Sequence, residues 1–419
     1  MNFRFFRRKI TGKIFSEAGS GQNSYNPQRR AGRSRRGARP RWQGGGCCRA
    51  GGRSSIPSRR SARGAPQARA CARSHDPRRR RCIQLAQNGL CNAAPNPMVG
   101  AVIVCDGKII GEGYHVRCGE AHAEVNAIRS VKDPSLLKRS TIYVSLEPCA
   151  HYGKTPPCAD LIIEKKIPRI VIGCQDPFAK VAGRGIRKLK DAGREVITGV
   201  LEDECRNLIR RFITFHTLRR PYITLKWAES ADKYIDKNRE DGQPVILSTP
   251  LTSMLVHKKR AEHNAIMVGT RTAELDNPSL TVRNWQGRSP VRIVTDRQLR
   301  LSPKLHVFDG NVRTLVFTEK PCQPQPNVEY IPIDFQRNIL PQIMEHLYMQ
   351  GLQSLLVEGG NILLQSFIDA ELWDEAFVEE SPLTLLSGIK APEIGNKAPC
   401  TNEVYFGRNF RHYSATRLG

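Results

Sequence analysis

The sequence predicts two successive α/β domains behind a long Arg-rich N-terminal extension. Three observations lead to this architecture. The chain has 419 residues, more than the roughly 250 to 300 residues that a single hydrophobic core usually serves. From residue 81 onward, apolar stretches of strand length alternate with segments of helical period, as in α/β folds. The series starts again after Pro221, so we expect the first domain at 76–218 and the second at 219–419.

The extension, residues 1–75, is rich in Arg, Gly, Ser and Pro and has neither a helical nor a strand period. Such a segment cannot bury enough apolar surface to offset its chain entropy, so we expect it to be disordered. Three roles fit this composition: an accessory extension with no part in the chemistry, an RNA-binding arm, or an organellar transit peptide. We prefer the accessory extension.

The formal net charge of +27 is concentrated in residues 1–81, the extension and the few residues that follow it. Of the 66 Lys and Arg residues, 23 precede residue 82, together with only two of the 39 acidic residues. The remainder is nearly neutral, whereas a nucleic-acid-binding fold carries its basic excess on a folded face. We therefore expect an enzyme for small molecules and no nucleic-acid partner.

The cysteines and the hydropathy pattern indicate the compartment. The 13 cysteines lack the dense, even spacing of a disulfide scaffold, which favours reduced thiols in the cytoplasm. No run approaches the roughly 18 consecutive apolar residues of a membrane span, and residues 1–10 lack the apolar run of a secretion signal. We expect a cytoplasmic protein without a membrane partner, and a homo-oligomer is left open.

The first domain begins with a predicted hairpin of two strands, 99–105 and 108–114, joined at Asp106-Gly107, a pair that tolerates positive φ. The elements that follow alternate. They are a helix at 121–131, a strand at 141–147, a helix at 158–166, a strand at 169–175, a helix at 185–193 and a strand at 195–200. This order predicts an α/β sandwich with a mainly parallel sheet. A basic amphipathic helix over 201–220 ends the domain.

Metal-binding side chains lie on these elements. His122-Ala-Glu124 opens a helix, and Cys149 and Cys158 follow a strand. One imidazole and two thiolates are three zinc ligands, and a catalytic zinc keeps its fourth position for water. Zinc nucleobase deaminases combine H-x-E with P-C-x-x-C and use the Glu as a proton carrier; here eight residues separate the two cysteines. The pattern predicts a zinc-dependent deaminase in which Glu124 moves protons.

The second domain is another alternating series. It comprises strands at 222–230, 265–269, 279–283, 291–296, 314–319 and 354–360, with helices near 253–262, at 339–349 and through Leu364. Glu358-Gly359-Gly360, between a strand and a helix, fits a phosphate cradle, because glycine backbone at a helix N-terminus can approach an anion. The two glycines could equally serve the geometry of the turn alone.

Five segments of the first domain carry a family resemblance: "PNPMVGAVIV", "GEGYH", "HAEVNAI", "SLEPCAHYGKTPPC" and "RIVIGCQDP". They resemble the deaminase half of the bifunctional riboflavin-biosynthesis deaminase and reductase family. The resemblance implies a cytidine-deaminase-like α/β sandwich, with zinc on His122, Cys149 and Cys158 and with Glu124 as proton carrier. The implied substrate is a diaminopyrimidine ribosylamine 5′-phosphate.

The same resemblance implies four substrate contacts in this domain. Asn96 matches the position that holds the ring, while His115, Lys154 and Thr155 match positions near the ribose phosphate. From the residues alone, Asn96 could be a turn residue between two prolines, and Lys154 a solvated loop charge.

Four segments of the second domain are similar to the reductase half of that family: "TLKWAESADKYI", "HKKRAEHNAIMVGTRTAELDNPSLTVR", "PVRIVTD" and "LLVEGGNILLQSF". The similarity implies a dihydrofolate-reductase-like α/β fold that uses NADPH to reduce the ribosylamino group to a ribitylamino group. The implied residues are Thr272, Asp276 and Gly360 for NADPH, Arg260, Leu280, Arg283 and Glu358 for the substrate, and Lys226 beside the cofactor at the reaction centre. Either arginine could instead form a structural ion pair.

Three positions depart from the family pattern. Phe178 follows Asp176-Pro177, where the family has Asn, and Pro244 and Ile246 replace a polar and an aromatic residue. One alternative is therefore that one half has lost its activity. The other is a nucleic-acid-editing zinc deaminase steered by the Arg-rich extension, which leaves residues 221–419 without a role.

Overall fold

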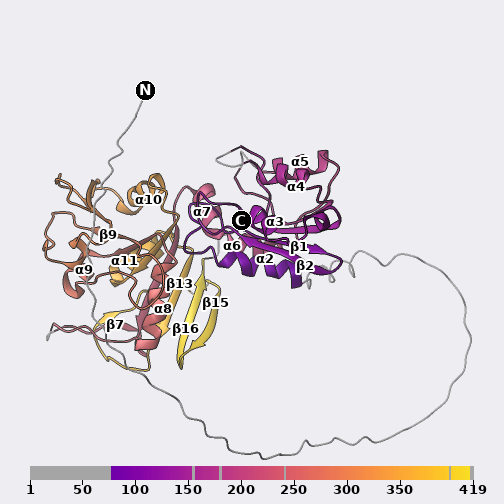
Figure 1. Cartoon of the computed structure of the whole chain (residues 1–419). Coiled ribbons are helices and arrows are strands. Elements are labelled where there is room, and N and C mark those ends of the chain that lie inside the picture. Colours follow the sequence, from indigo (N-terminus) through magenta and orange to yellow (C-terminus); the bar gives the residue numbers. More distant parts are fainter. Residues whose placement is uncertain (1–76, 153–155, 179–181, 240–241, 396–397, 416–419) are drawn as a thin grey trace, which may run out of the picture. The chain divides into compact units, whose positions relative to one another are not determined.

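The computed structural model describes residues 77–415 except 153–155, 179–181, 240–241 and 396–397. The predicted extension at 1–75 lies outside the described residues. Two large sheets organise the described chain, one built from strands between residues 100 and 197 and the other from strands between 222 and 414 (Figure 1).

The first sheet has five strands in the order β2-β1-β3-β4-β5. Its strands are β1 (Gly100–Cys105), β2 (Lys108–Tyr114), β3 (Thr141–Leu146), β4 (Arg169–Cys174) and β5 (Glu195–Ile197). β1 and β2 form the predicted hairpin, with Asp106 at φ 48° and Gly107 at φ 79° in its turn. β1 is antiparallel to both β2 and β3, whereas β3, β4 and β5 run parallel. The expectation of a mainly parallel sheet was therefore wrong for two of the four strand pairs.

Helices cover both faces of this sheet (Figure 1). They are α2 (Pro77–Gln87), α3 (Ala123–Arg129), α4 (Cys158–Glu164), α5 (Arg184–Asp191) and α6 (Glu202–Leu208), with a 3-10 turn η1 (Pro134–Arg139). Helices α3, α4 and α5 bury one core against Ile103, Ile142 and Ile170. Helices α2 and α6 bury the other face, where Val102 and Val104 point because successive strand residues alternate sides.

Two elements at the borders of this domain differ from expectation. Helix α2 was not predicted, because its run of four arginines outweighs the apolar pattern of Cys82, Leu85 and Ala86, which are buried against the sheet. The single helix predicted over 201–220 is two helices, α6 and α7 (Arg210–Leu218), because Ile209 leaves the helical conformation at φ −102° and ψ 19°.

The second sheet has nine strands in the order β11-β10-β9-β8-β12-β6-β13-β16-β15. They are β6 (Tyr222–Glu229), β8 (Ala265–Val268), β9 (Val291–Thr295), β10 (Thr314–Thr318), β11 (Val328–Pro332), β12 (Ser354–Glu358), β13 (Glu375–Glu380), β15 (Cys400–Tyr405) and β16 (Arg408–Ser414). The pairs from β11 to β13 are all parallel, and the β15–β16 hairpin joins in antiparallel fashion. A short sheet pairs β7 (Tyr234–Asp236) with β14 (Ile389–Lys390).

The helices of this part are α8 (Pro250–Ala261), α9 (Thr270–Asp276), α10 (Ile339–Met349) and α11 (Asn361–Asp369), with a 3-10 turn η2 (His306–Phe308). Helices α10 and α11 bury the largest core cluster against β6, β12 and neighbouring strands. Residues 279–283 are irregular, so the strand predicted there was wrong. Their Leu280 has φ 54° and a buried side chain, a left-handed conformation that no extended strand contains. None of the described helices has the length and apolar character that crossing a bilayer requires.

Candidate active sites

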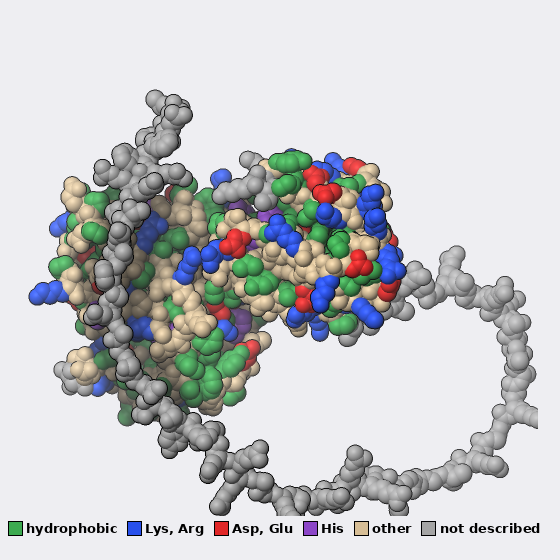
Figure 2. All heavy atoms as spheres, viewed as in Figure 1, with side chains coloured by type: hydrophobic (Ala, Val, Ile, Leu, Met, Phe, Trp, Pro, Cys, Tyr) green, Lys and Arg blue, Asp and Glu red, His purple; other side chains and the backbone are tan. Residues whose placement is uncertain are grey.

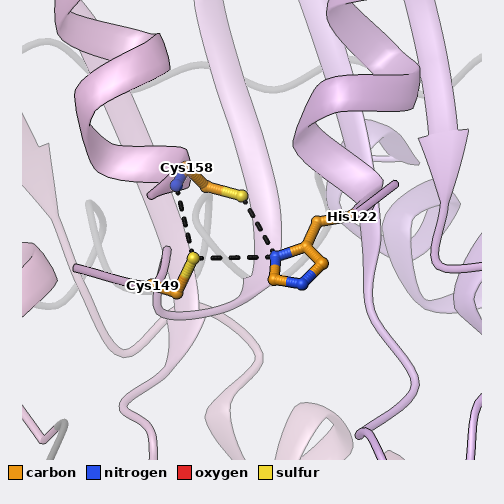
Figure 3. Close-up of side chains that lie close together, drawn as sticks. All are labelled: His122, Cys149 and Cys158. Carbon is orange, nitrogen blue, oxygen red and sulfur yellow. Dashed lines mark hydrogen bonds between the residues drawn. The ribbon is translucent and has the colours of Figure 1, made fainter. Parts of the chain in front are cut away.

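Three elements of the first domain bring His122, Cys149 and Cys158 together (Figure 3). His122 is the N-cap of α3, Cys158 is the first residue of α4, and Cys149 lies in the segment after β3. His122 Nδ1 lies 3.6 Å from the Sγ of Cys149 and 3.3 Å from the Sγ of Cys158. All three potential ligand atoms lie within 4.8 Å of one another, and Figure 3 shows them pointing to one centre.

This geometry fits zinc. With bonds of about 2.0 to 2.3 Å, the ligands of a tetrahedral zinc lie about 3.4 to 3.8 Å apart. Cys149 has the character of a thiolate, because hydrogen bonding with Cys158 and then His122 hold the pKa of its thiol well below the usual value. The backbone N–H of Cys158 donates to the same sulfur at 3.3 Å. Thiolate and imidazole are the ligand types that zinc prefers.

Glu124 is the second residue of α3 and is 3% exposed. Burial raises the pKa of its carboxyl to about 7, and the nearby negative sulfur of Cys149 adds to this effect. A carboxyl with a pKa near neutrality can both accept and release a proton at physiological pH. The charges of Cys149 and His122 act on this carboxyl, which places Glu124 close to the cluster.

Asn96 and His115 form a polar link to this cluster. Asn96 Nδ2 lies 3.1 Å from His115 Nε2, and His115 Nδ1 lies 3.2 Å from the carbonyl oxygen of Ala121. Burial lowers the pKa of His115, so its ring is neutral and can donate from Nδ1 while accepting at Nε2. The ring of His115 meets that of His122 edge-on, with centroids 5.5 Å apart.

The other predicted residues of this site have different outcomes. Lys154 and Thr155 lie outside the described residues. Phe178, one of the departures, packs its ring against His216 of α7 with centroids 5.4 Å apart. The backbone N–H of Phe178 donates to Asp176 Oδ1 at 2.9 Å, so the side chain of Asp176 closes the turn formed by residues 176–178.

In the second domain, Arg260, Glu358 and Lys226 lie together on one side of the sheet. Arg260 of α8 binds Glu358, at the end of β12, through two hydrogen bonds of 3.0 and 2.6 Å. Glu358 is the register partner of Lys226 on β6. Burial lowers the pKa of Lys226, and the charges of Glu358 and Glu379 oppose this effect. Arg260 also donates to the carbonyl oxygen of Thr281, which lies between Leu280 and Arg283.

The glycines of the predicted phosphate cradle lie against Thr272. Gly359 and Gly360 have φ of 79° and 76°, and a Cβ on Gly360 would lie 3.1 Å from Thr272 Oγ1. Both φ angles lie in the left-handed region that favours glycine, and Thr272 occupies the space where a Cβ would stand. Asp276, at the end of the same helix α9, forms an ion pair with Arg239 instead of standing free.

Of the remaining predicted substrate contacts, Leu280 is buried in a core cluster, whereas Arg283 is exposed. The backbone N–H of Arg283 donates to His257 Nδ1 at 3.2 Å, and its Nη1 donates to Thr281 Oγ1 at 2.9 Å. Ile246, another departure, has a 78% exposed side chain, and its neighbour Val245 donates to Asp236.

Sequence reasoning missed one carboxylate near Lys226. Glu379 of β13 is 1% exposed and accepts hydrogen bonds from Ser248 Oγ at 2.6 Å and Thr252 Oγ1 at 2.7 Å. Nothing in the strand sequence EAFVEE singles it out, because three of the six residues of β13 are glutamates. Only the pairing of β13 with β6 brings it near the lysine.

The first sheet and its His–Cys–Cys cluster are those of a zinc deaminase, and a reductase-type α/β domain follows it. Two family models agree: residues 74–174 match the cytidine and deoxycytidylate deaminase zinc-binding region, and residues 221–388 match the RibD C-terminal domain. The chain is 37% identical to riboflavin biosynthesis protein RibD of Bacillus amyloliquefaciens over 74% of this chain and 85% of that protein. It is 36% identical to RibD of Escherichia coli K12, over 73% and 87%.

Solved structures agree. The deaminase/reductase of Thermotoga maritima, described as a diaminohydroxyphosphoribosylaminopyrimidine deaminase/5-amino-6-(5-phosphoribosylamino)uracil reductase, is 38% identical with a TM-score of 0.74, over 80% of this chain and 97% of that one. RibD of Acinetobacter baumannii is 29% identical with a TM-score of 0.73, over 81% and 98%. The chain belongs to the RibD family of riboflavin biosynthesis proteins. The predicted fold class, a cytidine-deaminase-like domain followed by a dihydrofolate-reductase-like domain, is confirmed.

Proposed function

We propose that this chain performs two consecutive steps of riboflavin biosynthesis, a zinc-dependent deamination and an NADPH-dependent reduction. The substrate is 2,5-diamino-6-ribosylamino-4(3H)-pyrimidinone 5′-phosphate, and the reduction turns its ribosylamino group into a ribitylamino group. The observation that carries the proposal is the cluster of His122, Cys149 and Cys158 beside the buried Glu124. Membership of the RibD family supports both activities and both cofactors, zinc and NADPH.

In the deamination, His122, Cys149 and Cys158 hold the zinc. Zinc supplies a Lewis acid that makes water nucleophilic near neutral pH. Glu124 would carry the two protons of this water in turn, the first to a ring nitrogen and the second to the amino group, which leaves as ammonia. Asn96 and the neutral His115, which are hydrogen-bonded to each other, orient the substrate.

In the reduction, NADPH supplies the hydride. Thr272 and the backbone at Gly360 line its binding site, with Asp276 at the end of α9 and Lys226 at the reaction centre. Arg260 and Glu358 hold the substrate as a pair, and Leu280 shapes the turn that carries Arg283. The exposed guanidinium of Arg283 fits a phosphate monoester.

We place the deaminase domain at 76–218, the reductase domain at 219–419, and the enzyme in the cytoplasm. The strands support a boundary between these two domains, because the last strand of the first sheet ends at Ile197 and the first strand of the second sheet begins at Tyr222. The cytoplasmic assignment is supported by the ten cysteines within the described part of the chain, none of which forms a disulfide.

The nucleic-acid-editing alternative is not favoured. Residues 221–388 match a reductase-type family model, so the alternative leaves a whole domain without a task. On the face of the described chain that Figure 2 shows, acidic side chains are interspersed among the basic ones, and a nucleic-acid-binding face would be more uniformly basic.

A chelator tests the division of labour in the full chain. Stripping zinc is expected to stop deamination and to leave NADPH oxidation unchanged when the already deaminated ribosylamine is supplied, because the two groups of residues lie on different sheets. Ammonia release and absorbance of NADPH report the two steps, and added zinc should restore the first. Loss of NADPH oxidation on chelation would contradict two independent sites.

Changing Arg283 to alanine tests the reductase site. We expect KM of the reduction to rise about 10- to 100-fold, because a charge-assisted hydrogen bond contributes about 1.5 to 3 kcal/mol and about 1.4 kcal/mol is a factor of ten. Deamination should not change. Arg288→Ala is the matched control, since Arg288 is an exposed arginine of the same loop. Equal KM values in the two variants would remove Arg283 from the substrate site.

A further inference from the structure

A buried carboxylate lies two residues before a zinc ligand and has no part in the mechanism above. Glu147 follows β3 directly, is 4% exposed, and is followed by Pro148 and Cys149. Its backbone N–H donates to the carbonyl oxygen of Cys174 at 3.0 Å, which continues the pairing of β3 with β4. A buried charge is costly unless hydrogen bonds satisfy it, so its partners reveal what it holds in place.

Four backbone N–H groups donate to this one carboxylate. Those of Asp176 and Gly183 reach Oε2 at 3.3 and 3.0 Å, and those of Gly185 and Ile186 reach Oε1 at 2.9 and 3.2 Å. The last three lie at the start of α5, where helical N–H groups have no partner within the helix and where the helix dipole favours negative charge. Glu147 therefore caps α5 from a neighbouring strand.

The contact between α5 and the ligand-bearing segment is direct. A Cβ on Gly185 would lie 2.0 Å from the carbonyl oxygen of Pro148, so only glycine allows this approach. Pro148 joins Glu147 to Cys149. The carboxylate and the glycine thus fix the peptide immediately before Cys149 from two directions. For zinc to bind, the separation of Cys149 Sγ and His122 Nδ1, 3.6 Å here, has to stay close to the distance between two ligands of one tetrahedral zinc.

We propose that Glu147 is a positioning residue for the deaminase reaction, which fixes the Cys149 thiolate at the zinc site by tying its backbone to the first turn of α5. The inference rests on the proposed function, since it assumes that Cys149 holds zinc. Glu147 acts through Cys149 and does not itself touch the metal. Changes in the groups that orient metal ligands usually alter metal affinity or activity about 10- to 100-fold.

The test compares Glu147→Gln with the parent in the full chain. The amide offers one oxygen and turns an NH₂ group toward two of the four donors, so half of the anchoring is lost. Zinc release to a coloured chelator is expected to become about 10- to 100-fold faster, with a fall in kcat of deamination of similar size. The NADPH oxidation rate on the deaminated substrate should not change.

A matched control separates positioning from general loss of stability. Asp296 is 2% exposed in the second domain and accepts backbone N–H groups of Arg300 and Leu301 at 3.0 and 2.9 Å. Asp296→Asn weakens another buried carboxylate that anchors backbone N–H groups, in a turn far along the chain from the cluster, and is expected to leave zinc release at the parent rate. Glu147→Asp keeps the charge but shortens the side chain by one methylene, so it should give an intermediate zinc release rate. If the Gln variant does not fold, the Asp variant is compared with the parent in its place.

Parent-like zinc release and kcat in a folded Glu147 variant overturn the inference, as does equal acceleration in Asp296→Asn. A parent chain that holds no zinc would instead overturn the proposed function. The two failures are therefore distinguishable in one series of measurements.

Discussion

Replacing Cys158 with alanine is expected to remove bound zinc and to lower deamination more than about 100-fold, beyond the usual cost of losing a group that only orients a ligand. Cys158 is 1% exposed at the first position of α4, and its Sγ lies 3.3 Å from His122 Nδ1. Two remaining ligands cannot complete the three-residue set of a catalytic zinc. Metal analysis of the purified variant and ammonia release measure the two effects.

Cys174→Ala is the matched control for this change. Cys174 is also 1% exposed in the first domain, but its Sγ faces the carbonyl oxygen of Ser145, outside the metal cluster. It should lose some stability and keep its zinc. Stoichiometric zinc and full activity in Cys158→Ala would show that the assigned ligand set is wrong.

Glu124→Gln is expected to keep its zinc and to lose deamination by about 10² to 10⁴, the range for a group that transfers protons. The amide preserves the size of a side chain that is 3% exposed, but it cannot shuttle a proton between water and the ring. The NADPH-dependent step should continue on deaminated substrate. Zinc content and kcat for each step are the measurements.

Glu120→Gln provides the comparison, because Glu120 is an exposed carboxylate just before α3 with a long contact of 3.9 Å to Arg117. It should behave as the parent. If Glu124→Gln lost zinc together with activity, Glu124 would be a ligand or a determinant of the fold.

The sequence predicted best those features that depend on neighbours in the chain. The hairpin at 99–114 follows from one Asp-Gly turn between two apolar strands, and it forms as expected. The metal residues could be predicted because H-x-E at a helix start and two cysteines after a strand already restrict their positions. Their roles as ligands stay a prediction until metal is measured.

Features that depend on tertiary contacts could not be predicted. In α2, the arginines outnumber the apolar residues that the sheet buries, so the sequence has no clear helical pattern there. In residues 279–283 the alternation of apolar and polar residues is typical of a strand, although Leu280 adopts a left-handed conformation. The anchoring role of Glu147 also depends on α5, which follows it by nearly forty residues and contacts it only in the folded chain. A single glutamate before a proline gives no sign of such partners.

The strand order has a consequence for the order of events during synthesis. The first sheet is complete once Ile197 has been made, whereas β6 lies between β12 and β13, whose residues follow more than a hundred positions later. Domains tend to fold as units, N-terminal first, while the ribosome is still elongating the chain. The metal-binding half can therefore fold on the ribosome. The apolar Ile223, Leu225 and Trp227 of β6 stay unburied until β12 and β13, the two strands that pair with β6, have been made. A chain cut short between residues 230 and 350 would keep the first sheet whole and leave β6 unpaired on either side, a ready target for chaperones and proteases.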